Sequence, residues 1–149
     1  MKKVRIAIAA MMLAAAAHAD DFASAKDAQT MVGKAVKEIK TAGSEKAYAK
    51  FTGKDPAFID RDIYVVVYDM SGTVLAHGQN AKMVGKNLID LKDADGKAFV
   101  KERVDMAHLK DSFWQEYKFT DPVTKKVLPK SSYCERADQT VVCAGVYKR

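Results

Sequence analysis

The chain is poor in glycine, proline and histidine. Its 149 residues include 8 Gly, 3 Pro and 3 His, whereas 48% of its residues are hydrophobic. So little glycine and proline excludes collagen-like and low-complexity chains, and the abundant apolar residues exclude a wholly disordered one. The length fits one globular domain and leaves little room for a second.

The sequence also lacks the motifs of most metal-dependent and nucleotide-dependent enzymes. It contains no HExxH or CxxC, and its glycines form neither a dinucleotide-binding nor a P-loop fingerprint. Beyond the leader described below, only His77 and His108 remain, and no nucleophile stands beside a base. We therefore expect no catalysis, no cofactor and no metal. A small hydrolase with an unfamiliar active site stays open as an alternative.

One stretch partly imitates a calcium-binding loop. Asp93, Asp95 and Gly96 precede Glu102 at the spacing that such loops use, but Leu91 occupies the first ligand position, where an oxygen is required. We favour a turn in which Asp95 lies near a helix N-terminus, where a carboxylate is stabilised by the helix dipole.

Residues 1–19 are typical of a secretory signal peptide. A basic start over residues 2–5 precedes an apolar run over residues 6–17, and Ala17-His18-Ala19 gives a cleavage pattern before Asp20. The run is too short to anchor a protein in a bilayer. We therefore predict cleavage after Ala19 and a mature periplasmic chain, residues 20–149, without a membrane span.

The charge of the mature chain is nearly balanced. Three of the 25 Lys and Arg residues lie in the leader, which leaves 22 basic against 19 acidic side chains. Because these charges are interspersed, the sequence shows no nucleic-acid-binding surface.

The two cysteines, Cys134 and Cys143, are predicted to form a disulfide. Export to an oxidising compartment favours one. If Asp138 and Gln139 form the centre of a hairpin, the cysteines lie directly opposite each other, within disulfide reach. Two reduced buried thiols are the alternative. A redox-active pair is disfavoured because the spacing is not CxxC.

Apolar residues over 22–51 recur at intervals of three and four, which predicts a long helix with lysines on its opposite face. Gly43 and Ser44 are expected to break it, with Ser44 capping the second part. A helix of this kind needs a sheet or a partner to cover its apolar stripe. A dimeric coiled coil is the competing use, but the alanine content favours packing on the domain's own sheet.

After Asp55 and Pro56 the apolar period changes to two, which indicates strands. A long ordered loop is expected over residues 81–94, and a helix begins at Asp95 and Gly96. The order predicts an α+β fold in which the long N-terminal helix packs on a five-stranded antiparallel sheet. The predicted strands are 63–68, 73–77, 113–119, 126–135 and 140–147.

Aromatic and polar residues recur on these strands and could line a pocket for a small anion. One ammonium with several hydroxyl and imidazole groups would hold such a ligand. For each tyrosine alone, a core or surface position is the stronger interpretation, and a histidine such as His77 is more often structural than a ligand contact. Lys130 could be a solvated residue after Pro129. The set comprises Tyr64, Tyr68, His77, Tyr117, Lys130 and Tyr133.

The order and spacing of several motifs resemble the single Cache domain of the second subtype. The resemblance covers nearly all of the mature chain. The His-Gly, Val-Gly-Lys-Asn-Leu and Lys-x-x-Tyr elements are fairly specific for the family when they occur together, although no single one of them is. The motifs are Tyr64–Asp69, Leu75–Gly78, Val84–Leu88, Asp90–Asp93, Trp114–Tyr117, Asp121–Pro122, Pro129–Tyr133 and Gly145–Tyr147.

This resemblance implies a PAS-like extracytoplasmic sensor fold, with the long helix on one side of the sheet and a small-ligand pocket on the other. Members of the family commonly bind small organic acids and pass the signal onward. Lys130 and Tyr133 match the motif associated with the pocket, and Tyr68, His77 and Tyr117 match pocket-side positions.

Lys130 and Tyr133 are three residues apart, so on a regular strand they face opposite sides. We therefore expect either that Lys130 precedes regular pairing or that a bulge re-aims it.

The chain departs from the family's usual pattern in two places. Sensors of this family commonly continue into a membrane helix and a cytoplasmic module, whereas this chain ends at Arg149, and we expect no signalling across a membrane by the chain alone. Lys110-Asp111-Ser112 replace glycines that often precede the third strand, which would change the pocket rim.

The sequence thus predicts a soluble periplasmic protein that binds a small carboxylate and presents it to a membrane receptor, kinase or transporter. In this hypothesis Lys130 neutralises the carboxylate, and Tyr68 supplies a wall. Hydrogen bonds come from Tyr133, Tyr117 and His77. The alternative is an interaction module that uses the long helix and has a vestigial pocket.

Overall fold

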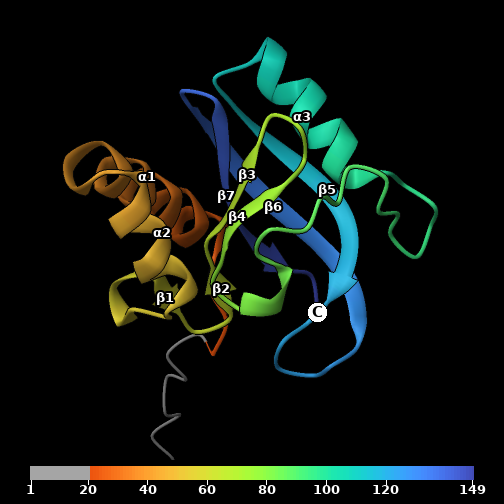
Figure 1. Ribbon diagram of the computed structural model, residues 1–149. Coiled ribbons are helices and arrows are strands. Elements are labelled where there is room, and N and C mark those ends of the chain that lie inside the picture. The colour runs from red at the N-terminus through yellow and green to blue at the C-terminus, as the bar shows by residue number, and fades with distance from the viewer. Residues whose placement is uncertain (1–20) are drawn as a thin grey trace, which may run out of the picture.

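The structure is a computed structural model that describes residues 21–149; the predicted signal peptide lies outside the described residues. Its main elements are three helices and a five-stranded sheet within that range (Figure 1). The helices are α1 (Ala25–Ala42), α2 (Ser44–Thr52) and α3 (Phe99–Leu109), with short 3-10 turns η1 (Pro56–Phe58) and η2 (Ala81–Met83). The strands are β1 (Ile59–Asp60), β2 (Ile63–Tyr64), β3 (Val66–Asp69), β4 (Val74–His77), β5 (Ser112–Thr120), β6 (Val127–Ala137) and β7 (Thr140–Tyr147).

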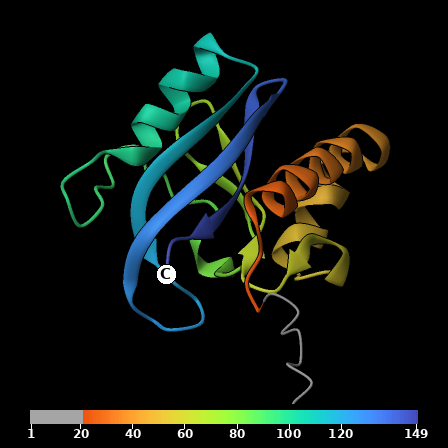
Figure 2. The ribbon, with the colours of Figure 1, turned by 180° about the vertical axis from the view of Figure 1, so that it is seen from behind.

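The main sheet has the order β4-β3-β7-β6-β5, and every neighbouring pair is antiparallel. A small ribbon of β1 and β2 stands beside it. Helices α1 and α2 cover one face of the sheet, and α3 lies on the other (Figures 1 and 2). The predicted α+β fold, with a long N-terminal helix on a five-stranded antiparallel sheet, is confirmed.

Helix α1 begins with a capping box, in which Ser24 and Asp27 satisfy each other's backbone N–H groups. It ends at Gly43, whose φ of 86° lies in a region that glycine adopts easily. The predicted break is therefore confirmed, but Ser44 is the first residue of α2 and its side chain makes no cap hydrogen bond. The two helices meet at an angle that lets both face the sheet (Figure 1).

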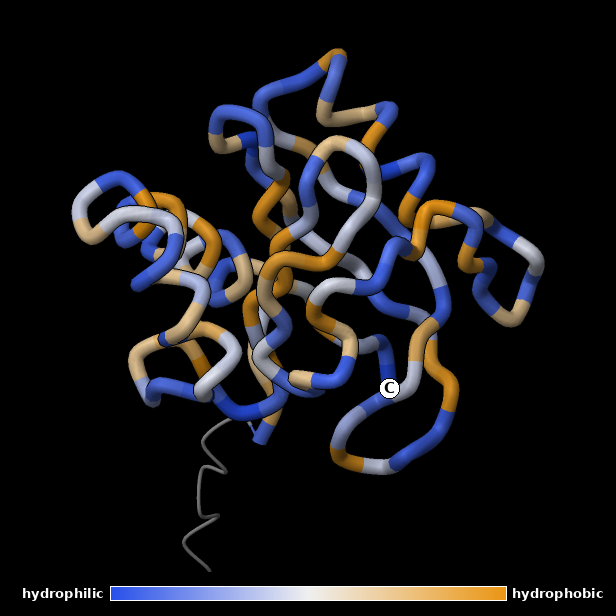
Figure 3. The backbone as a smooth tube through the Cα atoms, viewed as in Figure 1, coloured by the Kyte–Doolittle hydropathy of each residue, from blue (hydrophilic) through white to orange (hydrophobic). Residues whose placement is uncertain are grey.

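Strand alternation builds two apolar layers, one on each face of the sheet. Val65 and Val67 face α1 and α2, whereas Tyr64, Val66 and Tyr68 face the side of α3. Hydrophobic segments gather where the sheet meets its helices, and hydrophilic ones lie along the outer loops (Figure 3). Both faces of this segment are therefore buried, as its nearly continuous apolar sequence indicates.

None of the helices within residues 21–149 is both long enough and apolar enough to cross a bilayer.

The hairpin of β6 and β7 has the register that the cysteine spacing predicts. Its turn contains Asp138, with φ 53°, and the cysteines are direct partners across the two strands. Cys134 and Cys143 form a buried disulfide with a Cα–Cα separation of 4.2 Å. The predicted disulfide is confirmed, and the alternative of two reduced thiols is not observed.

We predict that reduction of this disulfide lowers the free energy of unfolding by about 2–3 kcal/mol, because the link closes a loop of roughly ten residues in the unfolded chain. Urea unfolding of the wild type with and without reductant measures the change. The double variant Cys134→Ala/Cys143→Ala is the control, since reductant should leave its midpoint unchanged. An unchanged wild-type midpoint after complete thiol labelling would contradict the prediction.

Candidate functional site

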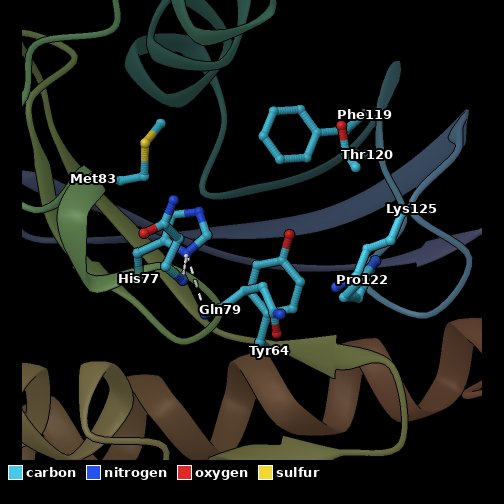
Figure 4. A pocket seen from close by; sticks show the side chains of 9 residues that line it. Tyr64, His77, Gln79, Met83, Phe119, Thr120, Pro122 and Lys125 are labelled. Carbon is cyan, nitrogen blue, oxygen red and sulfur yellow. Dashed lines mark hydrogen bonds between the residues drawn. The ribbon is translucent and has the colours of Figure 1, made fainter.

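A cavity of about 340 Å³ opens at the end of the sheet where β2, β4 and β5 approach one another (Figure 4). Its wall combines the ends of these three strands with the segment after β4 and the loop between β5 and β6. Its volume lies in the range of pockets for small molecules. The lining residues are Tyr64, His77, Gln79, Asn80, Met83, Phe119, Thr120, Pro122 and Lys125.

His77 ends β4 and presents a neutral imidazole to this cavity. Its ring stacks on Tyr64 with centroids 5.3 Å apart, and its Nδ1 accepts backbone N–H bonds from Gln79 and Asn80 at 3.2 and 3.0 Å. Because Nδ1 accepts two hydrogen bonds, the proton of the neutral imidazole lies on Nε2. Burial, with the charges of Lys130 and Arg103, lowers the pKa of His77 to about 4. His77 is therefore a hydrogen-bond donor through Nε2 at neutral pH.

Lys130, in β6, is a buried ammonium behind Tyr64. Only 3% of the residue is exposed, and its Nζ donates to the Tyr64 hydroxyl at 3.0 Å. The ammonium also lies over the rings of Tyr64 and Tyr147, 4.3 and 4.8 Å from their centroids. Burial opposes its charge, but the neighbouring oxygens of Tyr117 and Tyr64 keep its pKa above the ordinary lysine value.

No carboxylate among residues 21–149 forms an ion pair with Lys130. Buried charges in proteins are normally paired, because removing them from water costs several kcal/mol. The site therefore holds a positive charge whose compensation comes only from hydroxyl groups and aromatic rings.

A chain of hydroxyl groups connects this ammonium to the cavity wall. Tyr147 donates to the carbonyl oxygen of Thr120 at 2.8 Å, so its oxygen accepts from Tyr64 at 3.4 Å. The hydroxyl of Tyr64 in turn accepts from Lys130. Burial raises the pKa of both tyrosines, which keeps them protonated and able to donate.

Tyr117 and Tyr68 lie deeper on the same face of the sheet. The hydroxyl of Tyr117 is 3.2 Å from Ser132 Oγ, and its ring stacks on Phe99 at 4.5 Å. Burial alone would raise the pKa of Tyr117, but the charges of Lys130 and Arg103 bring it to about 8. Tyr68 is buried with the Arg103 guanidinium 5.2 Å from its ring centroid.

Tyr133 lies on the opposite face of the sheet from the other predicted site residues. Pairing of β6 with both neighbours is regular through this stretch, so neither the bulge nor the late start of pairing expected for Lys130 exists. Tyr133 points toward the side of α1, contacts the Trp114 ring at 5.3 Å and donates to Glu135 at 3.0 Å. The structure thus brings Tyr68, His77, Tyr117 and Lys130 to one face and leaves Tyr133 out.

Two residues of the site escaped the sequence analysis although each carries a signal. Tyr147 is the direct partner of Lys130 in the register that also pairs the two cysteines. Arg103 is a charged residue on the apolar stripe of α3, four residues after Phe99 and four before Ala107. The polar residues that follow β4 had no comparable pattern.

The stretch that imitates a calcium loop forms a turn. Asp93 Oδ1 accepts from the backbone N–H groups of Asp95 and Lys97, and its Oδ2 accepts from that of Lys118. Glu102 pairs with the Lys97 ammonium at 3.0 Å, so it points to a lysine rather than to the turn. Within the described residues no three His, Cys, Asp or Glu side chains gather as metal ligands would.

The pKa of His77 leads to a pH prediction. Below pH 6.5 the unfolded chain binds a proton that the folded protein accepts only near pH 4, so stability falls as the pH decreases through this window. The loss reaches about 2–3 kcal/mol at pH 4. His77→Asn keeps an acceptor for the two N–H groups and cannot titrate. Urea unfolding from pH 7 to 4 should show a shallower slope for this variant, and equal slopes would contradict the prediction.

Gly145 leaves room for the Lys130 side chain. A methyl group at this position would overlap Ser132 Oγ and lie 2.9 Å from Lys130 Cε. We therefore predict that Gly145→Ala costs about 1–3 kcal/mol of stability through overpacking.

The control is Gly33→Ala, at an exposed position of α1 with nothing within 4 Å. A gain of about 0.5–1 kcal/mol is expected there. Thermal or urea unfolding compares the two variants, and a Gly145→Ala protein as stable as the wild type would contradict the prediction.

Comparison with known proteins gives one family. The family model described as Single Cache domain 2 matches residues 1–147. A curated relative, the sensor histidine kinase MctS of Rhizobium johnstonii, is 33% identical over 89 residues, which are 58% of this chain and 19% of the kinase. The chain therefore spans about a fifth of that relative's length.

Solved structures show the same fold. A methyl-accepting chemotaxis protein from Vibrio parahaemolyticus is 23% identical with a TM-score of 0.71, over 82% of this chain and 86% of that one. A Cache chemosensory domain, solved to explain carboxylic acid recognition, is 21% identical with a TM-score of 0.70, over 83% and 92% of the two chains.

Proposed function

The chain belongs to the single Cache domain 2 family of sensory domains, and from this premise we propose that it binds a small carboxylate in the cavity beside Lys130. Cache domains are ligand-binding modules, and we propose that this one acts by binding rather than by catalysis. The carboxylic acid recognition described for the similar chemosensory domain agrees in kind with the chemistry of this cavity.

The observation that carries the proposal is the buried ammonium of Lys130 without a carboxylate partner. A carboxylate that enters the cavity and reaches Lys130 supplies the missing negative charge. Hydrogen bonds between an ammonium and a carboxylate are shorter and stronger than those between neutral groups. The ligand thus replaces the weak compensation from tyrosine hydroxyls and rings by an ion pair in a partly desolvated site.

Lys130 lies behind the cavity wall, and the residues that line the cavity suit the rest of such a ligand. His77 Nε2 offers a second donor to the carboxylate, because Nδ1 is occupied by two backbone N–H groups. The hydroxyl of Tyr64 lies between the cavity and Lys130 and is able to donate or accept. Met83, Phe119 and Pro122 supply an apolar wall for the hydrocarbon part.

The setting of the domain is part of the proposal. The extracytoplasmic role of Cache domains supports a periplasmic location, with residues 20–149 as one mature domain after cleavage behind Ala19. The similarity to a chemotaxis receptor and a sensor kinase supports presentation of the bound acid to a membrane receptor, kinase or transporter.

A thermal-shift screen of the mature oxidised protein against small carboxylates, amines and sugars tests the binding proposal. A ligand that binds only the folded state at 100 times its Kd adds about 2.7 kcal/mol of stability. Carboxylates should raise the Tm of the wild type and of Lys37→Gln, an exposed lysine of α1. The rise should be lost in Lys130→Gln.

Two results would overturn the proposal. One is an equal carboxylate shift in Lys130→Gln and the wild type. The other is no shift with any compound, together with concentration-dependent association in sedimentation, which would favour the interaction module built on α1.

A further inference from the structure

A second buried cation stands on the same face of the sheet as Lys130. Arg103 of α3 is only 2% exposed. Its guanidinium carbon lies 5.2, 5.6 and 5.1 Å from the ring centroids of Tyr68, Phe99 and Tyr117. Three rings around one guanidinium hold it in place and attract its charge, but they contribute no formal negative charge.

The hydrogen bonds of Arg103 are incomplete. Its Nε donates to Gln115 Oε1 at 3.0 Å, and Gln115 is itself oriented by donating to the Phe99 carbonyl at 2.8 Å. Its Nη2 is buried without a partner and is the single such side-chain atom among residues 21–149. A charged donor left unpaired in the interior is unfavourable and needs an explanation.

The protein's own buried carboxylates form no ion pair with this arginine. Asp62 and Asp121 are both paired with Arg149, at 2.8 and 2.7 Å, and no ion pair within the described residues includes Arg103. The layer between α3 and the sheet thus holds two positive side chains, Arg103 and Lys130, and no acidic residue among its buried members.

Both cations act on the same two side chains. Tyr117 is the direct strand partner of Lys130, and its ring faces Arg103. The charges of Lys130 and Arg103 both lower the pKa of Tyr117 and that of His77. A path of ring contacts also joins Arg103 to the cavity, because Phe119 lines the cavity and lies 6.1 Å from Tyr117.

We propose that the ligand of this domain is a small dicarboxylate, with one carboxylate on Lys130 and the other on Arg103. The inference rests on the proposed carboxylate-binding function and names the class of acid. A guanidinium fork matches a carboxylate in geometry, and Nη2 makes no hydrogen bond within the protein. A monocarboxylate neutralises one cation and leaves the other unpaired. Because Tyr117 and Phe119 separate Arg103 from the cavity, binding includes rotation of these rings.

Calorimetry with matched acids tests the inference. Succinate and butyrate share a four-carbon chain and differ in the second carboxylate. The wild type should bind succinate at least about tenfold more tightly, since a hydrogen bond to a charged group carries that difference. Arg103→Met should raise the Kd for succinate by about tenfold or more and that for butyrate by less than about twofold. Lys101→Met, an exposed site in the same helix, should change neither.

The outcomes separate this inference from the proposed function. If butyrate binds the wild type as tightly as succinate, the dicarboxylate inference is overturned and carboxylate binding stands, a comparison that needs no variant to fold. If sulfate binds as succinate does, with the same dependence on Arg103, the organic ligand class is overturned. If neither acid binds and no other carboxylate shifts the Tm, the proposed function itself fails.

Discussion

The register of the hairpin formed by β6 and β7 is the constraint on which the rest of the structure depends. One pairing places Cys134 opposite Cys143, Ser132 opposite Gly145 and Lys130 opposite Tyr147. The disulfide locks the register in the middle of the strands, while the missing side chain of Gly145 admits the lysine. A slip by one residue would turn Lys130 to the other face, because side chains alternate along a strand. The disulfide, the room beside Gly145 and the burial of the Lys130 ammonium are thus all consequences of this single strand register.

The two faces of the sheet then have different chemistry. The buried hydrophobic cluster under α1 and α2 is built from alanine, valine, isoleucine, methionine and phenylalanine, which suits a permanent contact. The layer under α3 contains tyrosines, Gln115, Ser132 and two cations. Hydroxyl groups, amides and charges depend on partners that an apolar layer does not need. The apolar layer on one face of the sheet thus lies opposite a layer with two buried cations that lack carboxylate partners, and the cavity lies on this second face.

Patterns with a strict period predicted the fold well. The three-four spacing of α1, the alternation around Val65 and the cysteine spacing each follow from geometry that local sequence determines. The residues of the candidate site were harder to predict from the sequence. Family resemblance indicated Lys130 and His77, but it grouped Tyr133 with them although a regular strand places that residue on the other face. Arg103 carried the opposite signal, a charge on an apolar stripe, whose meaning depends on which rings surround it in three dimensions.

The incomplete compensation of the two cations has a consequence for stability. Replacing buried charges by apolar side chains of similar volume is often neutral or stabilising, so a domain selected for stability alone would have little reason to keep Lys130 and Arg103. Natural proteins keep residues that reduce stability chiefly at functional sites, where the rest of the structure offsets the lost free energy of folding. In this domain the disulfide and the apolar layer under α1 offset the stability that is lost by burying the two cations. Arg103 Nη2 makes no hydrogen bond and the Lys130 ammonium has no carboxylate partner, so the proposed anionic ligand would supply the charge that both side chains lack.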